Sequence, residues 1–216
     1  MPRSHPFTAH IPALTNKDAI LYDVVGVGNA LVDMIAMVDD DFLGAHDMVK
    51  GSMALIETDR AVQLSQAVGA STRTSGGSGA NTLAGIASLG GDVAFIGKVA
   101  DDEFGAVFAD DMKKIGVDFR SSGSDSSVPT GRCIIAVTPD AQRTMNTFLG
   151  ISTQLSFSDI SSDVIAAGAI LYLEGYLFDR DEAKDAFRKA AALAHLNGRV
   201  VALTLSDSFC VDRHRA

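Results

Sequence analysis

Short runs of consecutive apolar residues recur along the chain, and several are separated by stretches in which apolar residues are three and four positions apart. Continuous apolar runs bounded by glycine or polar residues are typical of strands buried in a sheet. Strands are therefore predicted at 22–28, 32–38, 52–56, 92–99, 131–137, 144–149, 169–173 and 199–205.

The helical periodicity is clearest after Arg180, where alanines and leucines form one apolar stripe that ends at Gly198. Asp179 is the predicted N-cap, with Glu182 completing a capping box. Further helices are expected from Asp59 to about Val68, behind the glycines that follow a polar loop at Ser71–Ser75, and from Asp101 or Asp102 to Gly116.

Helices that alternate with apolar strands predict an α/β fold with a doubly wound, mostly parallel sheet. Two segments, about 32–57 and 117–130, interrupt the alternation and are expected to form a small β appendage. Residues 1–20 read as an N-terminal extension, and residues 21–216 as one domain.

Composition narrows the function classes. The chain of 216 residues carries a net charge of −9, which argues against binding to nucleic acid or to an anionic membrane surface. No apolar run is long enough to span a membrane. The two cysteines have neither metal-ligand spacing nor enough partners for a disulfide framework, so a cytoplasmic location is expected.

Two glycine patterns lack the residues that a nucleotide site needs. Gly26-Val27-Gly28 is followed by Leu31 where a dinucleotide-binding motif has its third glycine. Gly97-Lys98 is followed by Val99 instead of the hydroxyl residue of a P-loop.

The most informative segment is Gly-Gly-Ser-Gly-Ala-Asn at 76–81, at the start of a predicted helix. Glycines allow the backbone to approach a ligand closely, and a helix N-terminus offers free N–H groups. Two carboxylates are candidates beside it. Glu174 follows an apolar strand, where α/β sheets bind ligands, and Asp33 is either a ligand of hydroxyl groups or a surface carboxylate.

These residues together resemble the PfkB (ribokinase-like) family of carbohydrate and nucleoside kinases, close to its adenosine-kinase-type branch. The resemblance runs from about Asp23 to Arg215. It rests on linked motifs at 28–33, 76–81, 89–105, 129–133 and 203–209.

The resemblance implies a Rossmann-like domain with a β-sheet lid, ATP and Mg²⁺ as co-substrates, and phosphoryl transfer to a primary hydroxyl of a sugar or nucleoside. It also suggests a homodimer through the lid. Arg132 and Arg143 are weaker candidates for lid or charge roles, with solvated strand positions as the alternative. The acceptor contacts it implies are Asn29, Asp33, Gly76, Gly77, Ser78, Asn81, Glu174 and Tyr176.

Two features leave the acceptor and the activity open. Glu174 matches the sugar kinases better than the adenosine kinases, so a free sugar would use Glu174 and a nucleoside would stack on Tyr176. The family's Asn-x-x-Glu and Gly-Ala-Gly-Asp motifs, the second of which carries the catalytic base, do not occur here. The base is expected beyond Ala216, and the chain alone, truncated at its C-terminus, is expected to be inactive. The alternative is a non-catalytic ligand-binding or regulatory module.

Overall fold

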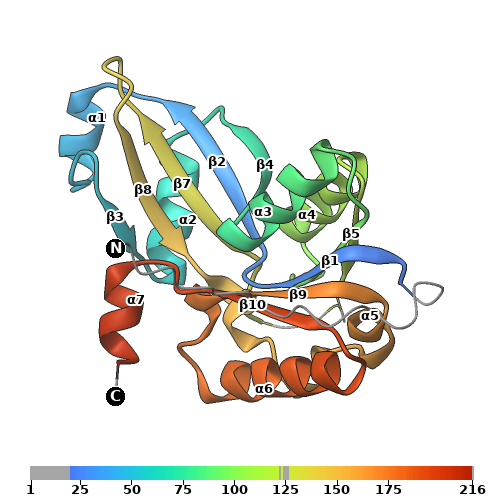
Figure 1. Ribbon diagram of the computed structural model, residues 1–216. Coiled ribbons are helices and arrows are strands. Elements are labelled where there is room, and N and C mark those ends of the chain that lie inside the picture. The colour runs from blue at the N-terminus through green and yellow to red at the C-terminus, as the bar shows by residue number, and fades with distance from the viewer. Residues whose placement is uncertain (1–19, 122, 124–126, 216) are drawn as a thin grey trace, which may run out of the picture.

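Two five-stranded sheets form the framework of the molecule (Figure 1). The computed structural model describes residues 20–121, 123 and 127–215. The predicted N-terminal extension therefore lies almost wholly outside the described residues.

Sheet A is parallel throughout, with the strand order β10-β9-β1-β5-β6. Its central strand β1 pairs with β5 on one side and with β9 on the other, as expected for the buried core of an α/β fold. The strands are β1 (Tyr22–Val27), β5 (Val93–Ile96), β6 (Val117–Arg120), β9 (Gly168–Glu174) and β10 (Val200–Thr204).

Helices cover both faces of sheet A, which confirms the predicted doubly wound architecture (Figure 1). On one face, α3 (Ser78–Ser88) and α4 (Glu103–Lys114) pack a cluster that includes Leu83, Phe95 and Phe108. On the other face, α5 (Ser162–Ala166) and α6 (Asp181–Leu196) pack a second cluster around Leu171 and Phe187.

Sheet B is mixed, with the order β3-β8-β7-β2-β4. Two short helices cover one of its faces through a third apolar cluster that includes Met34, Leu64 and Ile134. The opposite face is partly open. The elements are β2 (Leu31–Met37), α1 (Asp40–Ala45), β3 (Met53–Leu55), α2 (Thr58–Ala67), β4 (Thr72–Gly76), β7 (Gly131–Val137) and β8 (Arg143–Phe148).

Two expectations about sheet B differ from the structure, the first throughout and the second in part. The polar segment Ser71–Ser75, predicted as a loop, contributes β4, which pairs antiparallel with β2. Its polar residues are compatible with a strand because β4 lies at the edge of the sheet, where side chains meet solvent. The start of the segment 117–130 lies outside the appendage, because residues 117–120 form β6, which pairs with β5 in sheet A. Residues 122 and 124–126 of this segment lie outside the described residues.

The starts of two helices also differ from the sequence prediction. Helix α2 has Glu57 at its N-cap position, so Asp59 lies within the first turn. Helix α6 has Arg180 as its N-cap without a side-chain hydrogen bond, so the predicted capping box is absent. The Asp179 carboxylate instead pairs with Arg213 of α7 (Ser208–Arg213) and with His214, which follows that helix. At α4, the predicted cap is confirmed, since Asp102 accepts a hydrogen bond from the N–H of Gly105.

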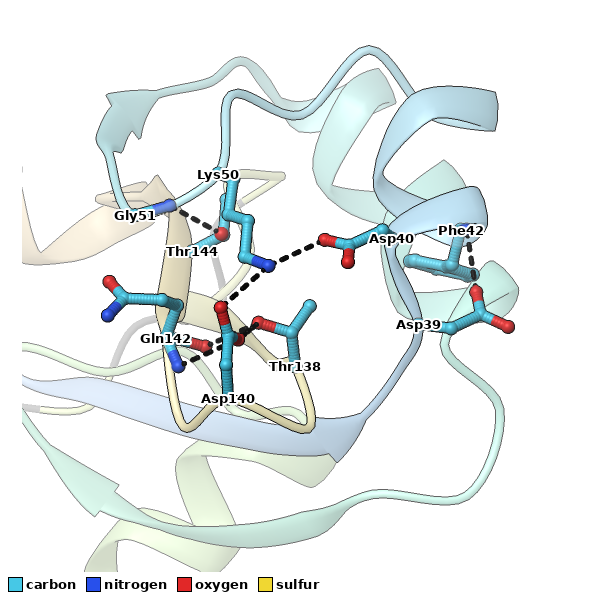
Figure 2. A network of polar contacts seen from close by, with 9 residues as sticks. All are labelled: Asp39, Asp40, Phe42, Lys50, Gly51, Thr138, Asp140, Gln142 and Thr144. Atoms are coloured by element: carbon cyan, nitrogen blue, oxygen red, sulfur yellow. Dashed lines mark hydrogen bonds and ion pairs between the residues drawn. The ribbon is translucent and has the colours of Figure 1, made fainter.

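A polar network joins helix α1 to the turn between β7 and β8, at one end of sheet B (Figure 2). The ammonium group of Lys50 lies 2.7 Å from Asp40 of α1 and 2.9 Å from Asp140 of the turn between β7 and β8. The hydrogen bond from Thr138, followed by the contact with Lys50, lowers the pKa of Asp140 to about 2. These contacts hold α1 against the β7–β8 hairpin.

The edge of sheet A at β10 exposes apolar side chains. Leu203 of β10 is 53% exposed, and Leu205 just beyond it is 64% exposed. Unpaired apolar strand edges favour association. We expect Leu203→Lys combined with Leu205→Lys to reduce concentration-dependent self-association, measured by light scattering. Unchanged association would show that another surface is responsible.

Candidate functional site

A cavity of about 230 Å³ lies where the open face of sheet B meets the carboxyl end of sheet A. Its walls come from β2, β3, β7 and β8 on one side, and from α3, the end of β9 and α7 on the other. It is lined by Asn29, Leu31, Asp33, Met53, Leu55, Gly77, Ser78, Cys133, Met145, Thr147, Leu149, Glu174, Tyr176, Asp179, Phe209 and Arg213.

Asp33 is the carboxylate in this cavity that has no protein partner among the described residues. It lies on β2 opposite Thr74 of β4 and Cys133 of β7. No hydrogen bond or ion pair to its carboxylate occurs among the described residues, and burial alone raises its pKa to about 6. A desolvated carboxylate without a partner is costly, so hydroxyl donors from a ligand would stabilise its ionised form.

The absence of a side chain at Gly76 makes room for this carboxylate. A Cβ at position 76 would lie 2.4 Å from the Cγ of Asp33. Since Leu31 and Gly76 are paired across β2 and β4, the glycine is held in place by the sheet itself.

We expect Gly76→Ala to displace the Asp33 carboxylate and to cost about 1–3 kcal/mol of the free energy of unfolding. In an Asp33→Ala background the clash is gone, so the same change should cost clearly less. Denaturant titration of the four proteins measures this coupling. Additive effects would show that the two residues do not compete for space.

Glu174, the last residue of β9, is 1% exposed and its carboxylate is saturated by protein donors. One oxygen accepts from the backbone N–H of Asn29 at 2.6 Å and from its side-chain amide at 3.0 Å. The other accepts from the N–H of Gly79 at 2.8 Å and from the hydroxyl of Ser78. Its acceptor capacity is therefore used within the protein.

The aromatic wall of the cavity consists of Tyr176 and Phe209, whose ring centroids are 5.8 Å apart. The guanidinium group of Arg213 lies 5.1 Å from the centre of the Phe209 ring and pairs with Asp179 at 2.8 Å. Burial, followed by the nearby charges of Asp207 and Glu174, raises the pKa of Tyr176. A flat ligand group could stack against this wall.

The structure brings together most of the predicted site residues but not all of them. Asn29, Asp33, Gly77, Ser78, Glu174 and Tyr176 line the cavity, and Gly76 packs directly behind Asp33. Asn81 is exposed on the first turn of α3 and does not line the cavity.

The two predicted arginines lie outside the cavity. Arg132 is buried with its guanidinium 4.8 Å from the centre of the Phe104 ring, and its Nε has no hydrogen-bond partner among the described residues. Arg143 is exposed at the start of β8.

Sequence reasoning missed most of the apolar wall. Its members lie two positions from other lining residues of the same strand: Leu31 is two positions from Asp33, and Met145 is two positions from Thr147. Because side chains two positions apart share one face of a strand, this spacing was a usable signal once Asp33 had been placed in the site.

Neither a metal cluster nor a membrane span is found in the part of the chain that the structure describes. No group of three or more His, Cys, Asp or Glu residues in residues 20–121, 123 and 127–215 is arranged to hold a metal ion. None of the helices in these ranges is both long and apolar enough to cross a bilayer.

The two-sheet fold is shared with a known class of kinases. The family model for the pfkB family of carbohydrate kinases matches residues 45–214, and the chain belongs to this family.

Individual relatives include both nucleoside and sugar kinases. The structure of adenosine kinase from Sinorhizobium meliloti is 49% identical with a TM-score of 0.82, over 91% of this chain and 60% of that one. A probable sugar kinase from Rhizobium etli CFN 42 is 43% identical with a TM-score of 0.81, over 91% and 59%.

A 5-dehydro-2-deoxygluconokinase of Clostridium perfringens is 33% identical over 129 residues, which are 58% of this chain and 38% of that protein. The chain therefore spans less than two thirds of the length of these relatives.

Proposed function

We propose that the cavity is the acceptor site of an ATP-dependent kinase and that it binds the hydroxyl groups of a nucleoside. The observation that carries this proposal is the unpartnered carboxylate of Asp33 inside a largely apolar cavity. A carboxylate that accepts hydrogen bonds from adjacent hydroxyls fits a ribose, and the surrounding apolar side chains fit a base.

The choice of a nucleoside over a free sugar rests on two features. The carboxylate of Glu174, which a free sugar was expected to use, is saturated by protein donors. Tyr176 and Phe209 form an aromatic wall against which a flat base can stack. The similarity to an adenosine kinase at 49% identity supports the same choice.

In the proposed reaction, this chain binds and orients the acceptor. Asp33 holds the sugar hydroxyls while the main chain at Gly77 and Ser78 forms the adjacent floor, and fixing the acceptor lowers the entropic part of the barrier. Asn81 is not placed among these contacts, since its side chain lies outside the cavity.

The family implies ATP and a divalent metal, and we propose no residue of this chain that would hold either group. The described residues contain no suitable cluster for a metal, and the N-terminus of α3 already holds the carboxylate of Glu174. We therefore derive no step through ATP or Mg²⁺, and propose that the 216-residue chain alone binds acceptor without turning it over.

Two further points belong to this proposal. The open face of sheet B exposes Ile35, Met37, Met53 and Leu55, which supports a homodimer through this sheet.

Both cysteines are free and buried, which supports a cytoplasmic location.

Titration calorimetry with adenosine, inosine, ribose and fructose tests the function. We expect adenosine or inosine to bind at least about fivefold more tightly than either sugar, because stacking of a base contributes about 1–3 kcal/mol. The alternative of a sugar kinase predicts the opposite order, and a regulatory module for another ligand predicts that none of the four binds.

A further inference from the structure

Glu174 occupies the place of a helix cap that α3 does not supply for itself. The N-cap residue of α3 is Gly77, which has no side chain, and the N–H of Gly79 is the second in the helix. That N–H donates to Glu174 at 2.8 Å, across 95 residues of sequence. A carboxylate at this point satisfies a free donor and interacts favourably with the helix dipole.

The same carboxylate fixes the connection between the two sheets. It accepts two hydrogen bonds from Asn29, which lies between β1 of sheet A and β2 of sheet B. The side-chain oxygen of Asn29 in turn accepts from Ser152 at 2.9 Å, and Ser152 follows β8 of sheet B. All three residues are at most 2% exposed.

Gly28 shows how closely these parts are packed. A Cβ at position 28 would lie 2.9 Å from both the Cβ and a carboxylate oxygen of Glu174. Glu174 therefore has little freedom to rotate away from Asn29 and α3 and to accept a hydrogen bond from a ligand instead.

We propose that Glu174 is a positioning residue, which places the floor at Gly77 and Ser78 against Asp33 and does not itself bind the acceptor. This inference rests on the proposed function, because it concerns the same cavity. It also assigns the ligand class at this end of the cavity. With the carboxylates of Asp33 and Glu174 beside the helix N-terminus, the floor suits a neutral polyhydroxylated ligand and disfavours a phosphate group.

The first test is Glu174→Gln, which keeps the shape and loses the charge and one acceptor. Affinity for adenosine, 2′-deoxyadenosine and 3′-deoxyadenosine is measured by calorimetry at a temperature where the protein remains folded. A positioning role predicts that all three affinities fall by a similar factor, about tenfold to a hundredfold, as expected for a lost charged hydrogen-bond acceptor. Glu182→Gln, on the exposed side of α6, is the matched control and should change nothing.

Two results would overturn the inference. If Glu174 contacts a hydroxyl, its variant will no longer distinguish adenosine from the analogue that lacks that hydroxyl. If Glu174 is only structural, thermal stability will fall while all three affinities remain those of the wild type. Failure of adenosine to bind the wild-type chain would contradict the proposed function instead, which keeps the two failures distinct.

Hydrogen exchange of the ligand-free chain tests the capping part without any ligand. In Glu174→Ala, which removes both carboxylate oxygens, the backbone amide of Gly79 should exchange about five to ten times faster, the factor expected for a lost cap. If that variant does not fold, Ser78→Ala removes one donor to the same oxygen and keeps the charge. It should weaken all three ligands about equally, by roughly twofold to tenfold. Selective weakening toward one analogue, or no weakening, would contradict the positioning role.

Discussion

Asp33→Asn is expected to weaken acceptor binding and to stabilise the ligand-free protein at the same time. A hydrogen bond to a charged group contributes about 1.5–3 kcal/mol, so the loss of the carboxylate should weaken nucleoside binding roughly tenfold to more than a hundredfold. The ligand-free variant no longer carries a desolvated charge, so its free energy of unfolding at neutral pH should rise by about 1–2 kcal/mol.

The pH dependence of both effects follows from the raised pKa of Asp33, which burial brings to about 6. In the unfolded chain the group titrates near 4. The folded state therefore binds a proton more tightly than the unfolded state, and the stability associated with this group is fully present below about pH 4 and is lost as the pH rises through about 6. The difference in unfolding free energy between Asp33→Asn and the wild type should be small below about pH 4 and reach its full value above about pH 6.

Binding should depend on pH in the opposite direction, because the ionised carboxylate accepts the ligand's hydrogen bonds. Wild-type affinity should fall by up to about tenfold per pH unit below pH 6, while Asp33→Asn should bind with a flat profile. Calorimetry and denaturant titration across this range measure both effects on the same proteins. Parallel changes in stability and affinity would contradict the assignment of Asp33 as the acceptor carboxylate.

Tyr176→Ala is expected to produce the second large effect, and a selective one. Stacking of a base on an aromatic side chain contributes about 1–3 kcal/mol, so affinity for adenosine should fall roughly fivefold to a hundredfold. Binding of ribose, measured by competition, should not change, because ribose has no base. Tyr176→Phe keeps the ring, and Phe157→Ala removes an aromatic side chain that is 57% exposed elsewhere. Both should bind adenosine like the wild type. An equal loss for adenosine and ribose would place the base away from Tyr176.

The fold could be predicted from the sequence wherever local pattern and burial agree. The strands β1, β5 and β9 are recognisable from their continuous apolar runs, and α6 is recognisable from its apolar stripe. Strand β4 could not be recognised in this way, since its polar residues become a strand only by pairing with β2. Asp179 had a suitable position for a local cap, yet Arg213 and His214, distant in sequence, bind its carboxylate.

The candidate site shows the same division. Asp33 and the glycines could be identified from their motifs, and the structure explains their pairing by the close approach at Gly76. That the carboxylate of Glu174 is saturated could not be predicted, because its four hydrogen bonds come from residues about 95 to 145 positions away. Whether a carboxylate is free or saturated depends on these tertiary contacts, and this difference decides which carboxylate can bind a ligand.

The most direct test of the central claim is a crystal structure of the 216-residue chain grown with saturating adenosine. We predict that the ribose hydroxyls lie within hydrogen-bonding distance of the Asp33 carboxylate and that the base stacks on Tyr176, with the contacts of Glu174 to Asn29 and Gly79 unchanged. Adenosine bound outside this cavity, or a cavity that remains empty at a concentration shown by calorimetry to saturate the protein, would contradict the account.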